Sequence, residues 1–243
     1  MNIILFKKSA YINKSEIIIK DKKKYKHIIK VLKANIGDSI KIGLINDLLG
    51  IGIIKNIDKT EKTITLKVEL NKKAPKKLNT TLILAMVRPK SLKKALHVAI
   101  SMGIKEIIII KTWKVDKSYW SSPLLLEESL NEISIEALEQ AKDTIMPKII
   151  IKKLFKPFIE DELSPLMNLK RGVIAHPIAQ NSFFDINNNA EPFNIDYLAI
   201  GPEGGFIDYE INKFKNIGFE VFKLNERILR VEYAIPVILS RLI

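Results

Sequence analysis

Cysteine is absent from this chain of 243 residues, which excludes a disulfide framework and a thiolate metal site. Long apolar runs are missing too, since no stretch approaches the roughly 18 apolar residues of a membrane span. The apolar residues Ile3 to Phe6 stand before Lys7 and Lys8 and are too few for the core of a signal peptide. We therefore expect a soluble, cytoplasmic protein, and 47% hydrophobic with 28% charged residues is ordinary globular composition.

Glycine is scarce, with ten residues in the whole chain, so a cluster of glycines is informative. Three of the ten lie within the five residues Gly201-Pro-Glu-Gly-Gly205. The apolar residues Leu198 to Ile200 predict a buried strand before this cluster, and a helical pattern begins near Asp208. Such a turn leaves bare backbone groups at the carboxyl end of a strand, where open α/β sheets bind ligands. The sequence predicts a ligand-binding turn here, and the alternative is a simple tight turn. The cluster matches neither a phosphate loop nor the dinucleotide fingerprint.

Arginine is rare in this lysine-rich chain, yet three of its five arginines, Arg227, Arg230 and Arg241, lie within the last 17 residues. Lysine does not replace arginine where a planar, forked donor is needed. Arg227 and Arg230 belong to the segment Leu224-Asn-Glu-Arg-Ile-Leu-Arg-Val-Glu-Tyr-Ala234, which follows a short predicted strand and opens the last predicted helix. These two arginines are therefore candidates for a functional role.

Together, the motifs Gly-Pro-Glu-Gly-Gly-Phe and Arg-Ile-Leu-Arg-x-Glu-x-Ala resemble those of the ribosomal RNA small-subunit methyltransferase E family, in the knotted SPOUT class of S-adenosylmethionine enzymes. The resemblance covers essentially the whole chain. It implies an α/β fold with a C-terminal trefoil-knotted SPOUT domain (residues 74–243), built on a mostly parallel sheet, and a small N-terminal PUA-like β-barrel domain that binds RNA (residues 1–73). It also implies S-adenosyl-L-methionine as cofactor, no metal, a homodimer formed through the C-terminal domain, and methylation of N3 of a uridine in small-subunit (16S) ribosomal RNA.

The residue pattern by itself divides the chain at Asn71 to Asn79, a polar segment with a proline that is typical of a linker. Before it, short β-rich pieces predict a small barrel or sandwich. One helix interrupts them near Lys22 to Ala34, with Ile28, Val31 and Leu32 on one face. After it, strands and helices alternate, which predicts a mostly parallel sheet with helices on both faces. The predicted strands are Leu82–Val87, Glu106–Lys111, Lys148–Phe155, Gly172–His176, Asp196–Ile200 and Phe219–Lys223, and the predicted helices are Ser91–Met102, Ser122–Asp143, Phe158–Asn168, Asp208–Ile217 and a last one after Arg230.

Positive charge is concentrated in residues 1–75, which carry 17 lysines against 7 acids, a net charge of +10. The remaining residues carry 23 basic and 20 acidic side chains, and the whole chain has a formal charge of +13. Basic surface confined to one domain is the usual footprint of phosphate binding. We therefore predict ribosomal RNA or the small ribosomal subunit as the partner, the alternative being a solvated lysine-rich surface. The candidate RNA-binding residues are Lys22, Lys23, Lys24, Lys26, His27, Lys30 and Lys33.

The resemblance also implies which residues line the cofactor site. By motif they are Ala175, His176, Gly201, Pro202, Glu203, Gly204, Gly205, Leu224, Asn225, Ile228, Leu229 and Arg230. Uracil N3 carries a proton at neutral pH, so a site that methylates it must stabilise the anion left when that proton leaves. We predict Arg230 for this role with Arg227 as second choice, and Glu232 as the residue that orients the arginine or accepts the proton. The alternative for Arg230 and Glu232 is an exposed pair on a helix.

The chain departs from the family pattern in several places, among them Ser101-Met102-Gly103 in place of a typical Glu-Leu-Gly. Asn225 stands where glycine is usual, Tyr233 where threonine is usual, and Asp143 where arginine is common. These departures leave open a methyltransferase that acts on another RNA position, or a non-catalytic basic RNA-binding or ribosome-assembly protein on the same fold.

Overall fold

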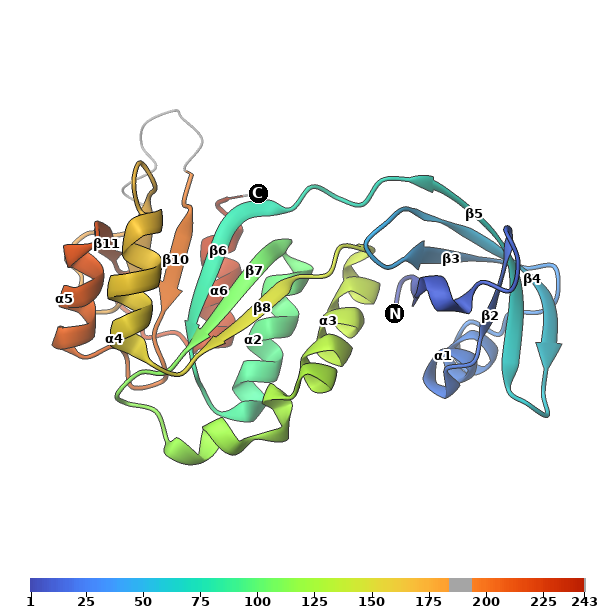
Figure 1. Ribbon diagram of the computed structural model, residues 1–243, viewed down its shortest axis with the longest axis horizontal. Helices are drawn as coiled ribbons and strands as arrows, with labels where there is room; N and C mark the ends of the chain where they lie inside the picture. The colour runs from blue at the N-terminus through green and yellow to red at the C-terminus, as the bar shows by residue number, and fades with distance from the viewer. Residues whose placement is uncertain (184–193, 243) are drawn as a thin grey trace. The chain divides into compact units, whose positions relative to one another are not determined.

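The computed structural model describes residues 1–183 and 194–242 and separates the chain into two compact units (Figure 1). The first unit comprises Met1–Lys76 and Ile135–Met146, and the second comprises Lys77–Ser134 and Pro147–Ile243. Throughout the part of the chain that is described, no helix is both long enough and apolar enough to span a bilayer.

The first unit is built on a mixed five-stranded sheet in the order β1-β3-β4-β5-β2. Its strands are β1 (Ile4–Phe6), β2 (Glu16–Ile19), β3 (Ser39–Leu44), β4 (Leu49–Asp58) and β5 (Thr63–Lys72). β1 and β3 run parallel, and the other neighbours are antiparallel. The β4–β5 hairpin closes at Asp58, whose carboxylate accepts hydrogen bonds from the backbone amides of Thr60 and Glu61 at 2.8 and 2.9 Å. One face of the sheet packs its isoleucines and leucines into a separate apolar core.

The predicted helix from Lys22 to Ala34 differs in the structure. A short helix α1 (Lys22–Lys26) continues into a π-helical turn, η2 (His27–Val31), in which the Leu32 amide donates to the His27 carbonyl at 3.0 Å. A π turn holds more residues than an α turn, so it shifts the side chains that follow around the helix axis. Ile28 is fully buried as predicted, but the expected common face is wrong for Val31 and Leu32, which are 64% and 46% exposed.

The segment Ile135–Met146, which the linker position places in the C-terminal domain, packs with the first unit. Its key residue is Glu139, only 2% exposed. The Glu139 carboxylate lies 3.1 Å from the Lys24 ammonium and accepts a hydrogen bond from the Leu5 amide at 2.9 Å. Because a buried carboxylate requires such partners, the end of helix α3 (Glu127–Ala141) is fixed to β1 and α1, which are far away in the sequence.

The second unit is an α/β fold whose six-stranded sheet is parallel throughout, in the order β11-β9-β10-β6-β7-β8. Its strands are β6 (Leu78–Ala85), β7 (Ile104–Ile110), β8 (Lys148–Lys152), β9 (Gly172–Ala175), β10 (Tyr197–Ile200) and β11 (Phe219–Phe222). Its helices are α2 (Pro89–Ser101), the first half of α3, α4 (Phe155–Pro157) with its π-helical continuation η5 (Phe158–Leu163), α5 (Asp208–Asn216) and α6 (Val231–Leu239). The prediction of a mostly parallel sheet in an α/β fold is confirmed.

Helices cover both faces of this sheet (Figure 1). On one face, α4, η5 and α5 pack with alternate strand residues such as Ile83 and Ile108 around the fully buried Phe214. The intervening strand residues, among them Leu82 and Ile107, are also fully buried, and they face α2 and α6 because side chains alternate along a strand. Near-continuous apolar strands are what a parallel sheet covered on both sides requires.

The register of the strands places their carboxyl ends at one common edge. Ala175 at the end of β9 pairs with Ile200 of β10 and with Phe222 of β11. Further along the sheet, Ile110 of β7 pairs with Lys152 of β8. All loops that follow these strands therefore leave the sheet from the same side, which is where α/β folds place their ligands.

Candidate functional site

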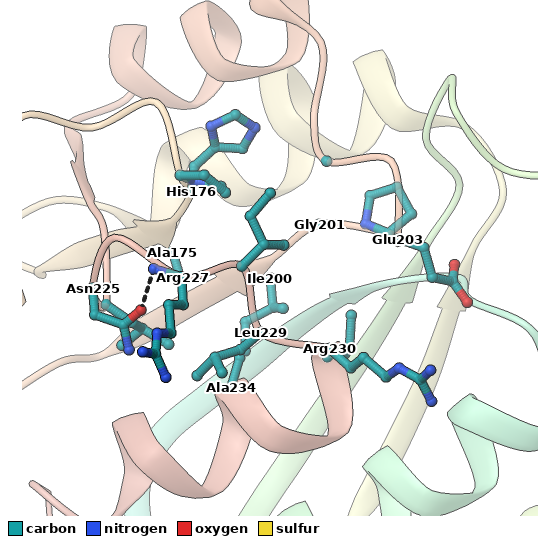
Figure 2. A pocket seen from close by; sticks show the side chains of 16 residues that line it. Ala175, His176, Ile200, Gly201, Glu203, Asn225, Arg227, Leu229, Arg230 and Ala234 are labelled. Atoms are coloured by element: carbon teal, nitrogen blue, oxygen red, sulfur yellow. Dashed lines mark hydrogen bonds between the residues drawn. The ribbon is translucent and has the colours of Figure 1, made fainter.

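A cavity of about 200 Å³ lies at this edge, where β9, β10 and β11 end (Figure 2). Each of the three strands contributes the loop that follows it, and α6 completes the wall. The lining residues are Ala175, His176 and Pro177 at the end of and after β9; Ile200, Gly201, Pro202, Glu203 and Gly205 at the end of and after β10; Leu224, Asn225 and Arg227–Arg230 after β11; and Val231 and Ala234 of α6. The two sequence motifs thus meet in one cavity, although residues 207–226 separate them in the chain.

The glycine turn is shaped by close packing against the β9 loop. Gly205 has φ +70°, in the left-handed region, and its amide donates to the Pro202 carbonyl at 2.8 Å. A Cβ atom at this position would lie 2.9 Å from Nε2 of His176. Both the backbone conformation and the space therefore require glycine.

His176 is held in a fixed orientation on the cavity wall. Its Nδ1 accepts a hydrogen bond from the Ile178 amide at 3.2 Å, and the ring also bonds the backbone of Phe206. Burial lowers the pKa of His176 below its ordinary value, and the positive charge of Lys114 acts in the same direction against the opposing effects of Phe206 and Asp208. The imidazole is therefore neutral at pH 7.

The loop after β11 carries both candidate arginines. The Asn225 side-chain oxygen accepts a hydrogen bond from the Arg227 amide at 2.6 Å (Figure 2), a local turn that asparagine forms readily. Arg230 immediately precedes α6 in an extended conformation. Figure 2 shows the two guanidinium groups on different sides of the cavity, Arg227 on the side of Asn225 and Arg230 on the side of Glu203.

The walls of the cavity are mostly apolar, with backbone groups of the glycine turn between them. The apolar lining side chains are Ala175, Pro177, Ile200, Pro202, Leu224, Ile228, Leu229, Val231 and Ala234. Glu203 is the one carboxylate among the described lining residues, and it accepts a hydrogen bond from the Arg88 amide at 3.1 Å. Ile228 is 80% exposed, so the cavity is open to solvent on that side. An elongated ligand with an apolar ring system and a few polar groups suits such a site.

The structure brings together nearly all the residues that the sequence assigns to cofactor binding. Gly204 is the exception, since it does not line the cavity and its carbonyl instead accepts a hydrogen bond from Lys114 at 3.0 Å. The lining residues that the sequence analysis missed are Pro177, Ile200, Val231 and Ala234. Ile200 ends the predicted strand, and Val231 and Ala234 share one face at the start of the predicted helix. Their positions next to the motifs could therefore have identified them as lining residues.

Glu232, predicted to assist the arginine, lies elsewhere. It is 5% exposed and lines a groove between α2 and α6 together with Tyr233, which is 55% exposed. Its carboxylate is 3.9 Å from the ammonium of Lys94 on α2. This placement suits a residue that fixes the start of α6 better than one that contacts a substrate.

The candidate RNA-binding residues of the first unit fall into two groups. Lys22, Lys26, Lys30 and Lys33 are exposed. Lys23 is also accessible, with 72% of its side chain exposed and its ammonium 3.9 Å from Glu136, whereas Lys24 is directed inward to Glu139. His27 is half-buried, and its Nε2 has no hydrogen-bond partner within the described ranges. The exposed lysines are therefore the ones available to a phosphate backbone.

The fold and the site define an RNA methyltransferase: the family model described as an RNA methyltransferase domain matches residues 74–243. Ribosomal RNA small subunit methyltransferase E of Rickettsia conorii is 30% identical over 213 residues, covering 86% of this chain and 82% of that protein. The protein of the same name from Treponema pallidum is 28% identical over 237 residues, covering 96% of this chain and 87% of that protein. The chain belongs to the ribosomal RNA small subunit methyltransferase E family.

A solved structure shares the complete fold. The crystal structure of ribosomal RNA small subunit methyltransferase E from Neisseria gonorrhoeae, bound to S-adenosyl methionine, superposes with a TM-score of 0.74 at 16% sequence identity. The similarity covers 98% of this chain and 95% of that one.

Proposed function

We propose that this protein transfers a methyl group from S-adenosylmethionine to N3 of a uridine in small-subunit (16S) ribosomal RNA. The observation that carries the proposal is the meeting of the glycine turn and the arginine-bearing loop in one cavity at the carboxyl edge of a parallel sheet. Relatives named for small-subunit ribosomal RNA methylation, aligned over most of the chain, support the same substrate.

The chemistry of the cavity fits the cofactor. S-adenosylmethionine, when bound, supplies a methyl group activated by a sulfonium cation. The apolar walls suit its adenine, and the backbone groups of the glycine turn offer hydrogen bonds to the edge of that ring. Because burial keeps His176 neutral, the wall of the cavity beside it carries no imidazolium that would repel the sulfonium.

Two features of the chain stabilise negative charge on the uracil. When the N3 proton leaves to solvent, charge spreads to the flanking carbonyl oxygens, and the guanidinium of Arg230 at the cavity wall can hold these oxygens. Helix α6 begins at Val231 without a side-chain cap, so its first amides add partial positive charge at the same place. Arg227 is the second candidate for contact with the base or its phosphate. Glu232, paired with Lys94, is proposed as a positioning residue for the start of α6.

The test separates binding from chemistry. In Arg230→Ala we expect the affinity for S-adenosylmethionine, measured by calorimetry, to stay within a factor of three of the wild type. Methylation of ribosomal RNA should fall about 100- to 1,000-fold, the usual loss when one preorganised donor is removed. Arg171→Ala is the matched control, because Arg171 forms an ion pair with Glu220 at 3.2 Å and does not line the cavity.

Unchanged turnover in Arg230→Ala would remove the role proposed for this arginine. Failure of the wild-type protein to bind S-adenosylmethionine would remove the proposed activity altogether. Mapping modified nucleotides in ribosomal RNA with and without the protein identifies the base and the atom that is methylated.

We further propose that the second unit is trefoil-knotted and forms a homodimer, that the first is a PUA-like RNA-binding domain, and that the protein acts in the cytoplasm. Membership of the family supports all four statements, and the exposed lysines of α1 and η2 support the RNA-binding role of the first unit. Sedimentation equilibrium of the full chain measures the oligomeric state, and a mass of 27.7 kDa at micromolar concentration would contradict the dimer.

A further inference from the structure

We propose that Trp113 and the cavity beside it form a stacking site for an unpaired base of the substrate RNA, a base close to the methylated nucleotide. The inference rests on the proposed function, which makes RNA the substrate. The stacking site belongs to the second unit and lies outside the cofactor cavity. Trp113 is the most exposed tryptophan side chain of the chain, at 80%.

The site is a second cavity of about 340 Å³ at the carboxyl ends of β7 and β8. Trp113 follows β7, Leu154 follows β8, and Tyr209 comes from the first turn of α5. Leu154 is 69% exposed and Tyr209 is 48% exposed. Two aromatic rings and an apolar side chain thus remain accessible around one depression, which is unusual on a surface as rich in lysine as this one.

The backbone beneath the indole is rigid. The Trp113 amide donates to one carboxylate oxygen of Glu210 at 2.8 Å, and the other oxygen of Glu210 accepts from the Ile207 amide at 3.0 Å. Glu210 itself is 3% exposed. A buried carboxylate that accepts hydrogen bonds from two backbone amides fixes both backbone segments, here those of Trp113 and Ile207. The backbone position of the exposed indole is therefore fixed before RNA binds.

The charges around the cavity suit a phosphate backbone. Lys111, Lys153 and Lys156 line it, and Glu210 is the one acidic residue among its described lining residues. Both oxygens of Glu210 are already engaged by backbone amides, so its charge is partly compensated. Aromatic rings within a basic groove are the combination that binds single-stranded nucleic acid, in which each stacked base contributes about 1–3 kcal/mol. A protein partner would instead favour a larger apolar surface with few lysines.

The stacking site lies close to the cofactor cavity along the edge of the sheet. Only β6 separates β10, which ends at the cofactor cavity, from β7, which ends at Ile110, three residues before Trp113. Two strand spacings correspond to about 10 Å. The segment after β10 also serves both cavities, because Gly201–Glu203 and Gly205 line the first and Ile207 and Tyr209 line the second. The ammonium of Lys114 donates to the carbonyl of Gly204 in the same segment. A strand of RNA that enters the first cavity passes over the second.

Tryptophan fluorescence tests the contact directly, because the chain has only two tryptophans. In Trp120→Phe, Trp113 is the sole indole. We expect a single-stranded oligouridylate to quench its fluorescence, and an abasic ribose-phosphate oligomer of equal length to bind without quenching. Equal quenching by both oligomers, or no quenching by the oligouridylate, would overturn the stacking proposal. This readout does not require methyl transfer, so it stands or falls separately from the proposed function.

Kinetics provide the second test. We expect Trp113→Ala to raise the KM for a single-stranded ribosomal RNA fragment about 5- to 150-fold, with kcat and the affinity for S-adenosylmethionine unchanged. Trp113→Phe, which keeps an aromatic face, should lie within threefold of the wild type. Leu166→Ala removes another exposed apolar side chain, 53% exposed and outside both cavities, and should have no effect.

Two outcomes would contradict the proposal. A Trp113→Ala variant that methylates the naked fragment normally, but is impaired on the assembled small subunit, would assign the ring to a protein contact. If kcat or the affinity for S-adenosylmethionine fell by the same factor as the KM rose, the effect would come from a structural defect of the glycine turn.

Discussion

The fit between Gly205 and His176 makes Gly205→Ala the most informative single change. The residue has φ +70°, which costs an alanine about 1–2 kcal/mol. The new methyl group would also lie 2.9 Å from Nε2 of a ring anchored by the Ile178 amide, and such overpacking typically costs about 1–3 kcal/mol. We therefore expect the free energy of unfolding, measured with urea, to fall by about 2–5 kcal/mol, and the affinity for S-adenosylmethionine to fall at least tenfold.

Gly218→Ala is the matched control for this prediction. Gly218 has φ +93°, yet a Cβ there would meet no atom within 4 Å. Its substitution therefore has the same conformational cost of about 1–2 kcal/mol without crowding, and cofactor affinity should stay unchanged. If Gly205→Ala binds the cofactor normally, or if both variants lose the same stability, the reasoning about the shape of the turn is refuted.

Three further predictions concern charge. The pKa of His176 lies below the ordinary value of 6.5 in the folded chain, so the unfolded chain binds more protons as the pH falls below 6.5, and the folded state loses stability. The Tm of the wild type should therefore drop more steeply from pH 6.5 to 5 than the Tm of His176→Gln. Parallel curves of Tm against pH would contradict this. Glu139→Ala leaves the ammonium of Lys24, whose side chain is 16% exposed, without its carboxylate partner, and should lower the free energy of unfolding, measured in urea, by about 3–5 kcal/mol. Adding Lys24→Met should restore part of the lost free energy. A decrease below about 1 kcal/mol would show that the pair contributes no more than a surface ion pair. Lys26→Ala with Lys30→Ala should reduce the slope of log K for RNA binding against log salt by about 0.7 per lost phosphate contact, and an unchanged slope would exclude both lysines from the interface.

Sequence patterns located the elements best where glycine marks an end. The helix predicted over Asp208–Ile217 is α5 (Asp208–Asn216), because Gly218 adopts the left-handed conformation that ends helices. The strand predicted over Gly172–His176 is β9, one residue shorter. At Ser122 the pattern predicted the start of a long helix, and the Ser122 hydroxyl does accept from the Leu124 amide at 3.3 Å. That cap opens only a 3-10 turn (Pro123–Leu125), and α3 begins at Glu127.

Long-range contacts explain what the patterns missed. The pairing of Lys24 with Glu139 joins residues 115 positions apart, and no periodicity within a window of the sequence reports it. The inward position of Lys24 therefore could not be distinguished from the exposed positions of Lys26 and Lys30. Similarly, Trp113 is one of three aromatic residues, with Tyr119 and Trp120, in the lysine-rich segment after β7. Its exposure became visible only when the ends of β7 and β8 were brought together.

The candidate cofactor site was easier to predict from the sequence, since each motif follows a strand directly. In a parallel sheet, loops after neighbouring strands necessarily meet at one edge, so two motifs sufficed to identify most of the cavity. Glu232 shows the limit of this argument. It lies two residues after Arg230, but the helix that begins at Val231 turns its side chain toward Lys94 on α2.

The interrupted course of the first unit has a consequence for synthesis of the protein. Its last strand, β5, ends at Lys72, but Glu139 is added to the growing chain only after residues 77–138 have been synthesised. At about 5–20 residues per second, translation of the 70 residues from Lys76 to Met146 takes roughly 4–14 s. During that interval the nascent first unit contains the Lys24 ammonium and the Leu5 amide without the Glu139 carboxylate that binds them. A chain truncated directly after the sheet would therefore lack the stabilising contacts of Glu139, and we expect it to be more susceptible to proteolysis.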